Sequence, residues 1–148
     1  MNPPLEILLV EDNPHDAELT IRTLSKHHLS NHLLQVSDGQ AALDFLLGTG
    51  AHAGRDCRQQ PKVVLLDLKL PKLDGIEVLR QLRADERTRQ VPVVVLTSSR
   101  EDCDVIQAYQ LGANSYIVKP MDFEKFSETV RQIGLYWLLL NEPILLQP

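Results

Sequence analysis

The chain has 148 residues, two cysteines and a formal net charge of -5. A chain of this length forms one domain that buries about two thirds of its unfolded surface, so folding requires neither disulfides nor a structural metal. The negative charge and the scattered basic residues disfavour a nucleic-acid surface. No apolar run approaches about 20 residues and no export signal is recognisable, so a cytoplasmic protein with reduced thiols and no membrane contact is expected.

The first predicted strand, residues 5–10, ends at Glu11 and Asp12. A helix is expected to follow to about residue 25, because Asn13 is a suitable N-cap. Asp16 lies near the positive end of the helix dipole, where a carboxylate is favourable. The buried side of this helix is predicted to comprise Ala17, Ile21 and Leu24.

A second strand is predicted at 33–36, and a second helix, capped by Asp38, at 40–47. The apolar pattern then disappears from 48 to 61. This stretch contains several glycines and is interpreted as a long surface loop, to which the sequence assigns no function.

The segment Val63–Leu66 is an unbroken run of branched apolar residues that ends at Asp67. A run without alternation is typical of a strand buried on both faces, as in a parallel sheet. The carboxyl ends of such strands carry the functional site, so Asp67 is either a functional carboxylate or a helix cap. A turn and a third helix follow, whose predicted buried residues are Ile76, Leu79 and Leu82.

Two further predicted strands also end in polar residues. Residues 91–96 lead to Thr97, and Ser115–Val118 leads to Lys119. The helix after Thr97 is predicted to face inward through Val105, Ile106 and Tyr109. The final helix is predicted to face inward through Phe123, Phe126, Val130 and Ile133. Five alternating strands and helices predict an α/β fold, a doubly wound parallel sheet with helices on both faces.

The polar residues at the strand ends should meet at one edge of this sheet. They are Glu11, Asp12, Asp67, Thr97 and Lys119. Three carboxylates this close repel by about 4 kcal/mol per pair at 4 Å and an effective dielectric near 20, unless a cation joins them. Oxygen ligands without His or Cys favour Mg2+. With Mg2+ and Lys119 to neutralise an incoming phosphoryl group, Asp67 is the predicted acceptor, and Thr97 can bond a phosphoryl oxygen after transfer.

This pattern resembles the receiver domain of two-component response regulators. The matching residues are Glu11-Asp12, Asp67, Leu70-Pro71, Asp74-Gly75, Thr97 and Lys119-Pro120. The resemblance implies a flavodoxin-like sheet with strand order 2-1-3-4-5. It also implies that Asp67 accepts phosphate from a sensor histidine kinase. By the same resemblance Asp12, Asp67 and the backbone carbonyl of Lys69 bind Mg2+, Glu11 acts through the waters of the metal, and Lys119 pairs with the phosphoryl group.

The resemblance further implies a switch made of Thr97 and Tyr116. Thr97 would move toward the phosphoryl group, and the ring of Tyr116 would turn inward behind it. An aromatic side chain on an edge strand with its hydroxyl in water is the plain alternative for Tyr116. The resemblance also implies a cis peptide bond between Lys119 and Pro120.

Three alternative functions are less consistent with the sequence. A haloacid dehalogenase-type phosphatase also uses an Asp nucleophile with Mg2+, but it requires a second acid where this chain has Lys69. A flavodoxin-like cofactor carrier needs a Ser/Thr/Gly-rich phosphate loop where Glu11 and Asp12 would repel phosphate. A pseudo-receiver that works without phosphorylation is the third. The chain is therefore not expected to be an enzyme, apart from its own phosphorylation and dephosphorylation.

The predicted receiver spans 1–134, and a helix extension with a tail spans 135–148. No output domain is predicted, so signalling is expected through protein contact. A homodimer through the extension is expected, unless the tail folds back over its own sheet. The residues expected to form the dimer surface are Tyr136, Trp137, Leu139 and Leu140, with the apolar tail residues Ile144, Leu145 and Leu146. The long second loop and the leucine-rich last helix are similar to small regulators of bacterial and cyanobacterial phytochromes, which implies a phytochrome-type kinase.

Overall fold

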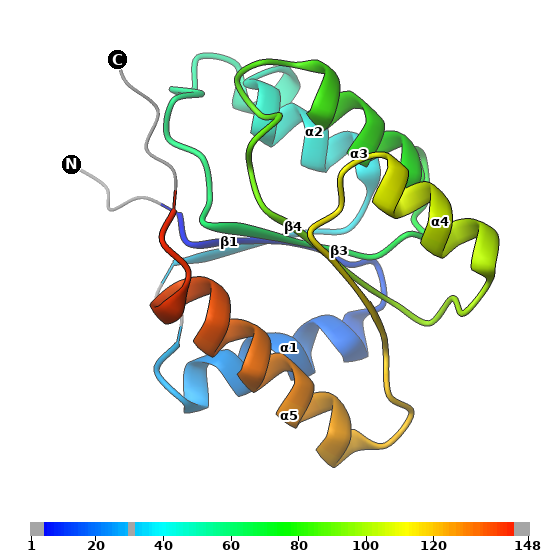
Figure 1. Cartoon of the computed structure of the whole chain (residues 1–148). Coiled ribbons are helices and arrows are strands. Elements are labelled where there is room, and N and C mark those ends of the chain that lie inside the picture. Colours follow the sequence, from blue (N-terminus) through cyan, green and yellow to red (C-terminus); the bar gives the residue numbers. More distant parts are fainter. Residues whose placement is uncertain (1–4, 30–31, 144–148) are drawn as a thin grey trace.

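The computed structural model describes residues 5–29 and 32–143, which form an α/β sandwich around one parallel sheet (Figure 1). All strand pairs are parallel, and the order is β2-β1-β3-β4-β5. The strands are β1 (Ile7–Val10), β2 (Leu33–Val36), β3 (Val63–Leu66), β4 (Val93–Thr97) and β5 (Ser115–Val118). The predicted doubly wound fold and its strand order are therefore confirmed.

Helices cover both faces of the sheet, with α1 and α5 on one side and α2, α3 and α4 on the other (Figure 1). The helices are α1 (Pro14–Lys26), α2 (Gly39–Leu47), α3 (Gly75–Ala84), α4 (Asp102–Gln110) and α5 (Phe123–Gly134). A short 3-10 turn, η1 (Gly50–His52), lies in the long second loop, and a π-helical turn, η2 (Leu135–Leu140), continues α5. None of the helices among the described residues is long and apolar enough to cross a membrane.

Two apolar clusters hold the layers together, one on each face of the sheet. Alternate residues of β1, β3 and β4 pack against α2 and α3 on one face and against α1 and α5 on the other. Every residue of these three central strands is buried. Burial on both faces explains why their sequences are apolar without alternation. It also fixes the register of each strand, and with it the place of the residue that follows.

Local caps set where the helices begin at the functional edge. The side chain of Asn13 accepts hydrogen bonds from the backbone N–H groups of His15 and Asp16, at 2.9 and 3.1 Å, and so starts α1. At the start of α3, a Cβ atom on Gly75 would lie 2.4 Å from the carbonyl oxygen of Asp67. Glycine is therefore required here, because α3 begins directly against the end of β3.

Four apolar residues that were predicted to face inward are exposed, by between 38% and 59%: Ile21, Ile106, Tyr109 and Phe123. In α1 the buried face contains threonines instead. The hydroxyl of Thr20 donates to the carbonyl of Asp16 at 2.8 Å, and that of Thr23 lies 2.9 Å from Ser127 Oγ, so both can be buried without an unpaired polar group. In α4, which packs near the edge strand β5, Ala108 is the buried residue.

The helix extension packs only partly against the domain. Leu138 is buried and Trp137 packs at the margin of the core beneath α1 and α5. Tyr136, Leu139 and Leu140 remain exposed, with 65% of Leu139 and 75% of Leu140 accessible to solvent. The predicted tail residues Ile144, Leu145 and Leu146 lie outside the described residues.

Candidate functional site

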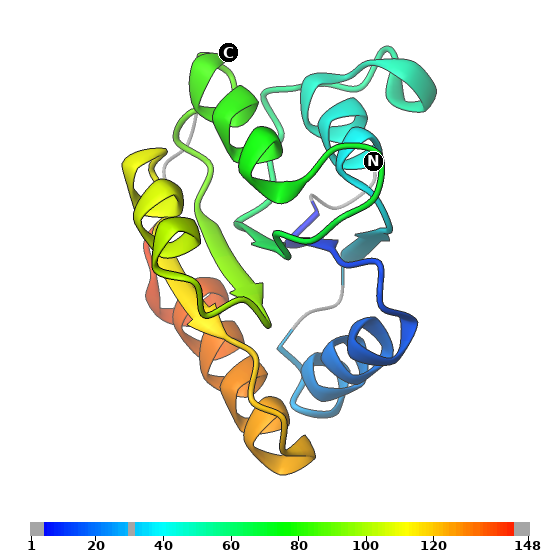
Figure 2. The same cartoon turned by 90° about the vertical axis from the view of Figure 1, so that its right-hand side faces the viewer.

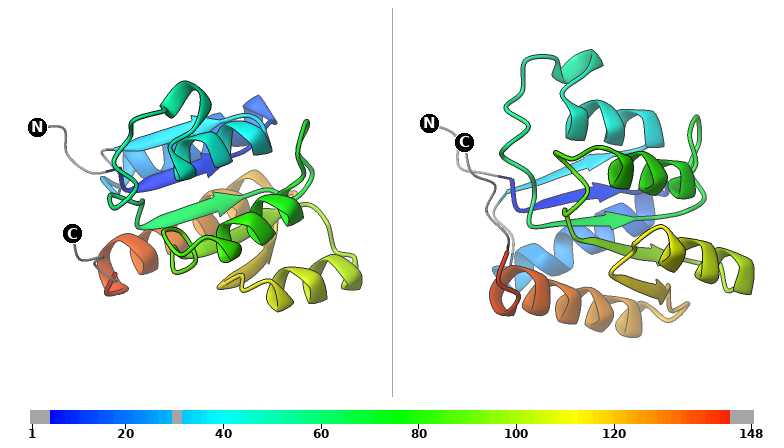
Figure 3. Two further views of the ribbon diagram at one scale, coloured as in Figure 1. Left: turned by 90° about the horizontal axis from the view of Figure 1, so that it is seen from above. Right: turned by 45° about the horizontal axis from the view of Figure 1, so that its top comes forward.

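The carboxyl ends of the parallel strands meet at one edge of the sheet, which is turned toward the viewer in Figure 2. The five predicted strand-end residues lie there: Glu11, Asp12, Asp67, Thr97 and Lys119. The strands run in one direction (Figure 3), and Val10 lies beside Leu66, which lies beside Val95. The residues that follow these positions are therefore brought together. Asp12 is exposed, whereas the other four are buried.

The ammonium group of Lys119 lies at the centre of this group. Its Nζ is 2.6 Å from Glu11 Oε1, 2.9 Å from Asp67 Oδ2 and 2.9 Å from Asp16 Oδ2. Asp16 was predicted to be a first-turn helix charge and not a site residue. Its contact with Lys119 is a tertiary contact between the first turn of α1 and the residue that follows β5. The only local sign of it in the sequence was that Asp16 follows the helix cap Asn13 by three residues.

Asp67 accepts hydrogen bonds on both carboxylate oxygens. Thr97 Oγ1 donates to Oδ1 at 2.8 Å, the backbone N–H of Lys69 lies 3.2 Å from the same oxygen, and Lys119 donates to Oδ2. Burial acts to raise the pKa of Asp67, but the hydrogen bond and charge of Lys119, with the bonds from Thr97 and Lys69, outweigh it and lower that pKa. Asp67 is therefore ionised at neutral pH and available as a nucleophile.

Glu11 differs from Asp67 in its ionisation. Burial, which the ion pair with Lys119 only partly offsets, raises the pKa of Glu11 to about 7, and the nearby charge of Asp67 adds to this effect. The carboxyl group of Glu11 is therefore partly protonated near neutral pH, although it lies against the ammonium group of Lys119.

Glu11, Asp12 and Asp67 can all contribute to one cation site. Each offers a carboxylate oxygen, and these three oxygens lie within 4.8 Å of one another. A site with oxygen ligands and excess negative charge suits a hard divalent cation such as Mg2+. The side chain of Lys69 points to a different group, since its Nζ is 3.4 Å from Asp104 Oδ2 on α4.

The two predicted switch residues lie on neighbouring strands. Thr97 is fully buried, and Tyr116 on β5 is half-buried. The Tyr116 hydroxyl donates to the backbone carbonyl of Ser99 at 3.0 Å, so it bonds to the loop after β4. The prediction of a cis peptide bond between Lys119 and Pro120 was wrong, since this bond is trans. The Lys119 N–H donates to the carbonyl of Thr97 at 2.7 Å, and this extension of the β4–β5 pairing already brings the side chain to the site.

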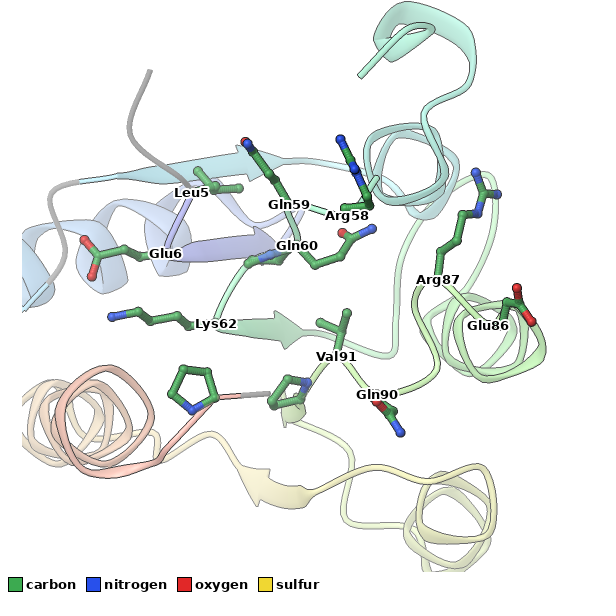
Figure 4. A pocket seen from close by; sticks show the side chains of 13 residues that line it. Leu5, Glu6, Arg58, Gln59, Gln60, Lys62, Glu86, Arg87, Gln90 and Val91 are labelled. Carbon is green, nitrogen blue, oxygen red and sulfur yellow. The ribbon is translucent and has the colours of Figure 1, made fainter. Parts of the chain in front are cut away.

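A cavity of about 270 Å³ lies at the opposite edge of the sheet (Figure 4). Its lining includes Leu5 and Glu6 before β1, Lys62 before β3, and Val91 before β4. These positions precede the strands, so the cavity is separate from the acidic site.

A doubly wound sheet with clustered acids, a threonine and a lysine at its carboxyl edge defines a receiver domain. The family model described as the response regulator receiver domain matches residues 7–131, and the chain belongs to this family. Receiver domains signal according to their phosphorylation, take the phosphoryl group from a sensor histidine kinase, and bind Mg2+ or Mn2+ in the acidic site. The predicted family is thus confirmed.

Two curated relatives match over most of their length. The probable methanogenesis regulatory protein FilR2 of Methanothrix harundinacea is 47% identical over 138 residues, covering 93% of this chain and 86% of the relative. The response regulator Rcp1 of Synechocystis sp. is 38% identical over 137 residues, covering 93% and 91%.

Solved structures agree with this assignment. The Mn(2+)-bound form of Rcp1 superposes with a TM-score of 0.88 at 35% identity, covering 96% of this chain and 99% of that chain. The phosphorylated cyanobacterial phytochrome response regulator RcpA superposes with a TM-score of 0.88 at 33% identity, covering 95% and 99%. The chain is therefore similar to phytochrome response regulators.

The raised pKa of Glu11 predicts a pH-dependent stability. The folded-state pKa of about 7 lies above the ordinary value of 4.5, so burial of Glu11 favours its protonated form. We compare the unfolding free energy of the wild type with that of Glu11→Gln in the absence of divalent cations. The difference, wild type minus variant, should fall by about 2 to 3 kcal/mol as the pH rises from about 4.5 to about 7, and then level off. Urea unfolding with a chelator present measures this difference.

The exposed residue Glu86 provides the control for this experiment. The same comparison with Glu86→Gln controls for the loss of one negative charge from the surface of the protein. A Glu11→Gln difference that does not change with pH would contradict a buried Glu11 with a raised pKa.

Proposed function

We propose that Asp67 is the phosphoryl acceptor of this receiver domain. The observation that carries the proposal is the environment of its carboxylate, which is ionised, buried, and held between the Thr97 hydroxyl and the Lys119 ammonium group. Beside it lie two further carboxylates, Glu11 and Asp12, suited to a divalent cation. No other role accounts as simply for a nucleophile, a cation site and a fixed positive charge at one sheet edge.

In the proposed transfer, a carboxylate oxygen of Asp67 bonds to phosphorus as the bond from phosphorus to the donor histidine nitrogen breaks. Before transfer, Lys119 and the Thr97 hydroxyl both donate to Asp67. After transfer, Lys119 pairs with the phosphoryl oxygens, and the Thr97 hydroxyl donates to one of these oxygens. Asp12, Asp67 and the backbone carbonyl of Lys69 would hold Mg2+, with Glu11 acting through its waters. The cation supplies charge neutralisation for the transferred group.

Signalling is proposed to use Thr97 and Tyr116 as a pair. A phosphoryl group adds about -1.5 to -2 charge, and shifting a conformational equilibrium from 1:99 to 99:1 requires about 5.5 kcal/mol of preference for one state. Several charge-assisted hydrogen bonds can supply this. Movement of Thr97 toward the phosphoryl group would leave space for the Tyr116 ring, which is at present tied to Ser99.

The proposed donor is a sensor histidine kinase of the phytochrome type, acting in the cytoplasm. The similarity to RcpA and Rcp1 supports this donor, whereas FilR2, which is more identical to this chain, is described as a probable methanogenesis regulatory protein. Phosphotransfer from a purified phytochrome-type histidine kinase, compared with a histidine kinase that lacks a phytochrome sensor, tests this donor.

The proposed domain limits are 1–134 for the receiver and 135–148 for a dimer-forming extension. The exposed side chains of Tyr136, Leu139 and Leu140 support a partner surface at η2. Trp137 contributes less, because it packs partly on its own core.

The acceptor assignment predicts a single phosphoryl adduct. Intact-mass measurement after incubation with Mg2+ and acetyl phosphate or phosphoramidate should show one added phosphoryl group on the wild type and none on Asp67→Asn. A chelator should abolish the adduct, since the cation is required. An adduct of equal yield on Asp67→Asn, or none on the wild type, would contradict the assignment; the second result would indicate a pseudo-receiver.

The extension surface predicts a dimer that depends on two leucines. Analytical ultracentrifugation at micromolar concentration should detect a dimer for the wild type and a monomer for the double variant Leu139→Asp and Leu140→Asp, because an interface cannot bury these charges unpaired. The matched control is Ile106→Asp on α4, which adds a charge at another exposed apolar residue and should leave the dimer intact. A wild type that is monomeric with and without phosphorylation would refute the dimer.

A further inference from the structure

A closed ring of polar contacts joins the acceptor carboxylate to the first turn of α4. Asp67 Oδ1 accepts from Thr97 Oγ1 at 2.8 Å and lies 3.2 Å from the N–H of Lys69. The ring continues from Lys69 Nζ to Asp104 Oδ2 at 3.4 Å, and from that oxygen to Ser99 Oγ at 2.5 Å. It closes through the Ser99 N–H, which lies 3.4 Å from Thr97 Oγ1.

Asp104 is the residue of this ring that comes from outside the strand ends. It lies in the first turn of α4, and 14% of its side chain is exposed. Its carboxylate binds two side chains at once, those of Lys69 and Ser99, and each follows a site residue by two positions. Asp104 is thus placed to control both sides of the acceptor without touching it.

The ammonium group of Lys69 can pair with either of two anions, the Asp104 carboxylate or a phosphoryl group on Asp67. Its backbone is fixed beside Asp67, and its side chain is 64% exposed with the ammonium group drawn to Asp104. A phosphoryl group on Asp67 would place about two negative charges near the base of the same side chain. The two anions therefore compete for one ammonium group.

We propose that Asp104 is a positioning residue that sets the lifetime of the phosphorylated state by holding Lys69 away from the phosphoryl group. The inference rests on the proposed function of Asp67. In dephosphorylation, a water oxygen bonds to phosphorus and the bond between phosphorus and the Asp67 oxygen breaks. The electron pair of that bond returns to the Asp67 carboxylate, and phosphate leaves with the protons of the water, one of which passes to solvent. An ammonium group paired with the phosphoryl oxygens covers them from water, and Asp104 limits that pairing.

The same competition links the acceptor to α4. Each time Lys69 moves to the phosphoryl group, Asp104 loses one of its two partners. Ser99, the other partner, also accepts the hydroxyl of Tyr116 on its carbonyl. The first turn of α4 is therefore coupled to the charge on Asp67 through Asp104.

The decay of the phosphorylated protein tests this proposal. The wild type and its variants are phosphorylated with acetyl phosphate and Mg2+, the donor is removed, and the remaining adduct is followed by intact mass. Asp104→Asn should slow the decay by about two- to fivefold, the range expected for a partly exposed ion pair. In a Lys69→Met background, which keeps the length of the side chain and removes its charge, Asp104→Asn should change the decay by less than about 1.5-fold.

Asp102→Asn is the matched control, because it removes one charge from the same helical turn at an exposed residue. Its decay should equal that of the wild type. The proposal is overturned if Asp104→Asn leaves the decay unchanged or speeds it, if Asp102→Asn has the same effect, or if the effect persists without the Lys69 charge. Adduct formation on the wild type separates these results from a failure of the acceptor assignment.

Discussion

The concentration of negative charge around Lys119 is the constraint on which this site depends. Three carboxylates, those of Glu11, Asp16 and Asp67, contact one buried ammonium group. A charge removed from water is costly unless an opposite charge is held beside it, so the carboxylates and the ammonium group depend on one another. The arrangement keeps Asp67 ionised while Glu11 retains affinity for a proton, and so leaves an acidic edge that favours an added cation.

The rest of the fold maintains this arrangement. A slip in the register of a central strand would draw the polar residue that follows it into the apolar core, so the residues after these strands stay aligned. The start of α3 presses against the carbonyl of Asp67 through Gly75, and the cap of α1 at Asn13 directs Asp16 toward Lys119. Most of the functional residues lie in loops, and each loop is held at its two ends by the buried strand before it and the helix after it.

Much of the fold and of the acidic edge could be predicted from the sequence, because strand ends in a parallel sheet must meet. Asp16 and Asp104 could not be assigned, since their roles depend on side-chain distances between separate elements. Periodicity also misplaced Ile106 and Tyr109, because it identifies an apolar stripe without showing whether a partner covers it. The family resemblance misplaced one detail, the isomer of the bond between Lys119 and Pro120.

The central claim is that Asp67, and not a neighbouring acid, carries the phosphoryl group. Borohydride reduction of the phosphorylated protein, followed by peptide mass spectrometry, tests it directly, because an aspartyl phosphate is reduced to homoserine where a free carboxylate is not. The account predicts homoserine at position 67 alone. Homoserine at position 12 or 16, with Asp67 unchanged, would contradict it.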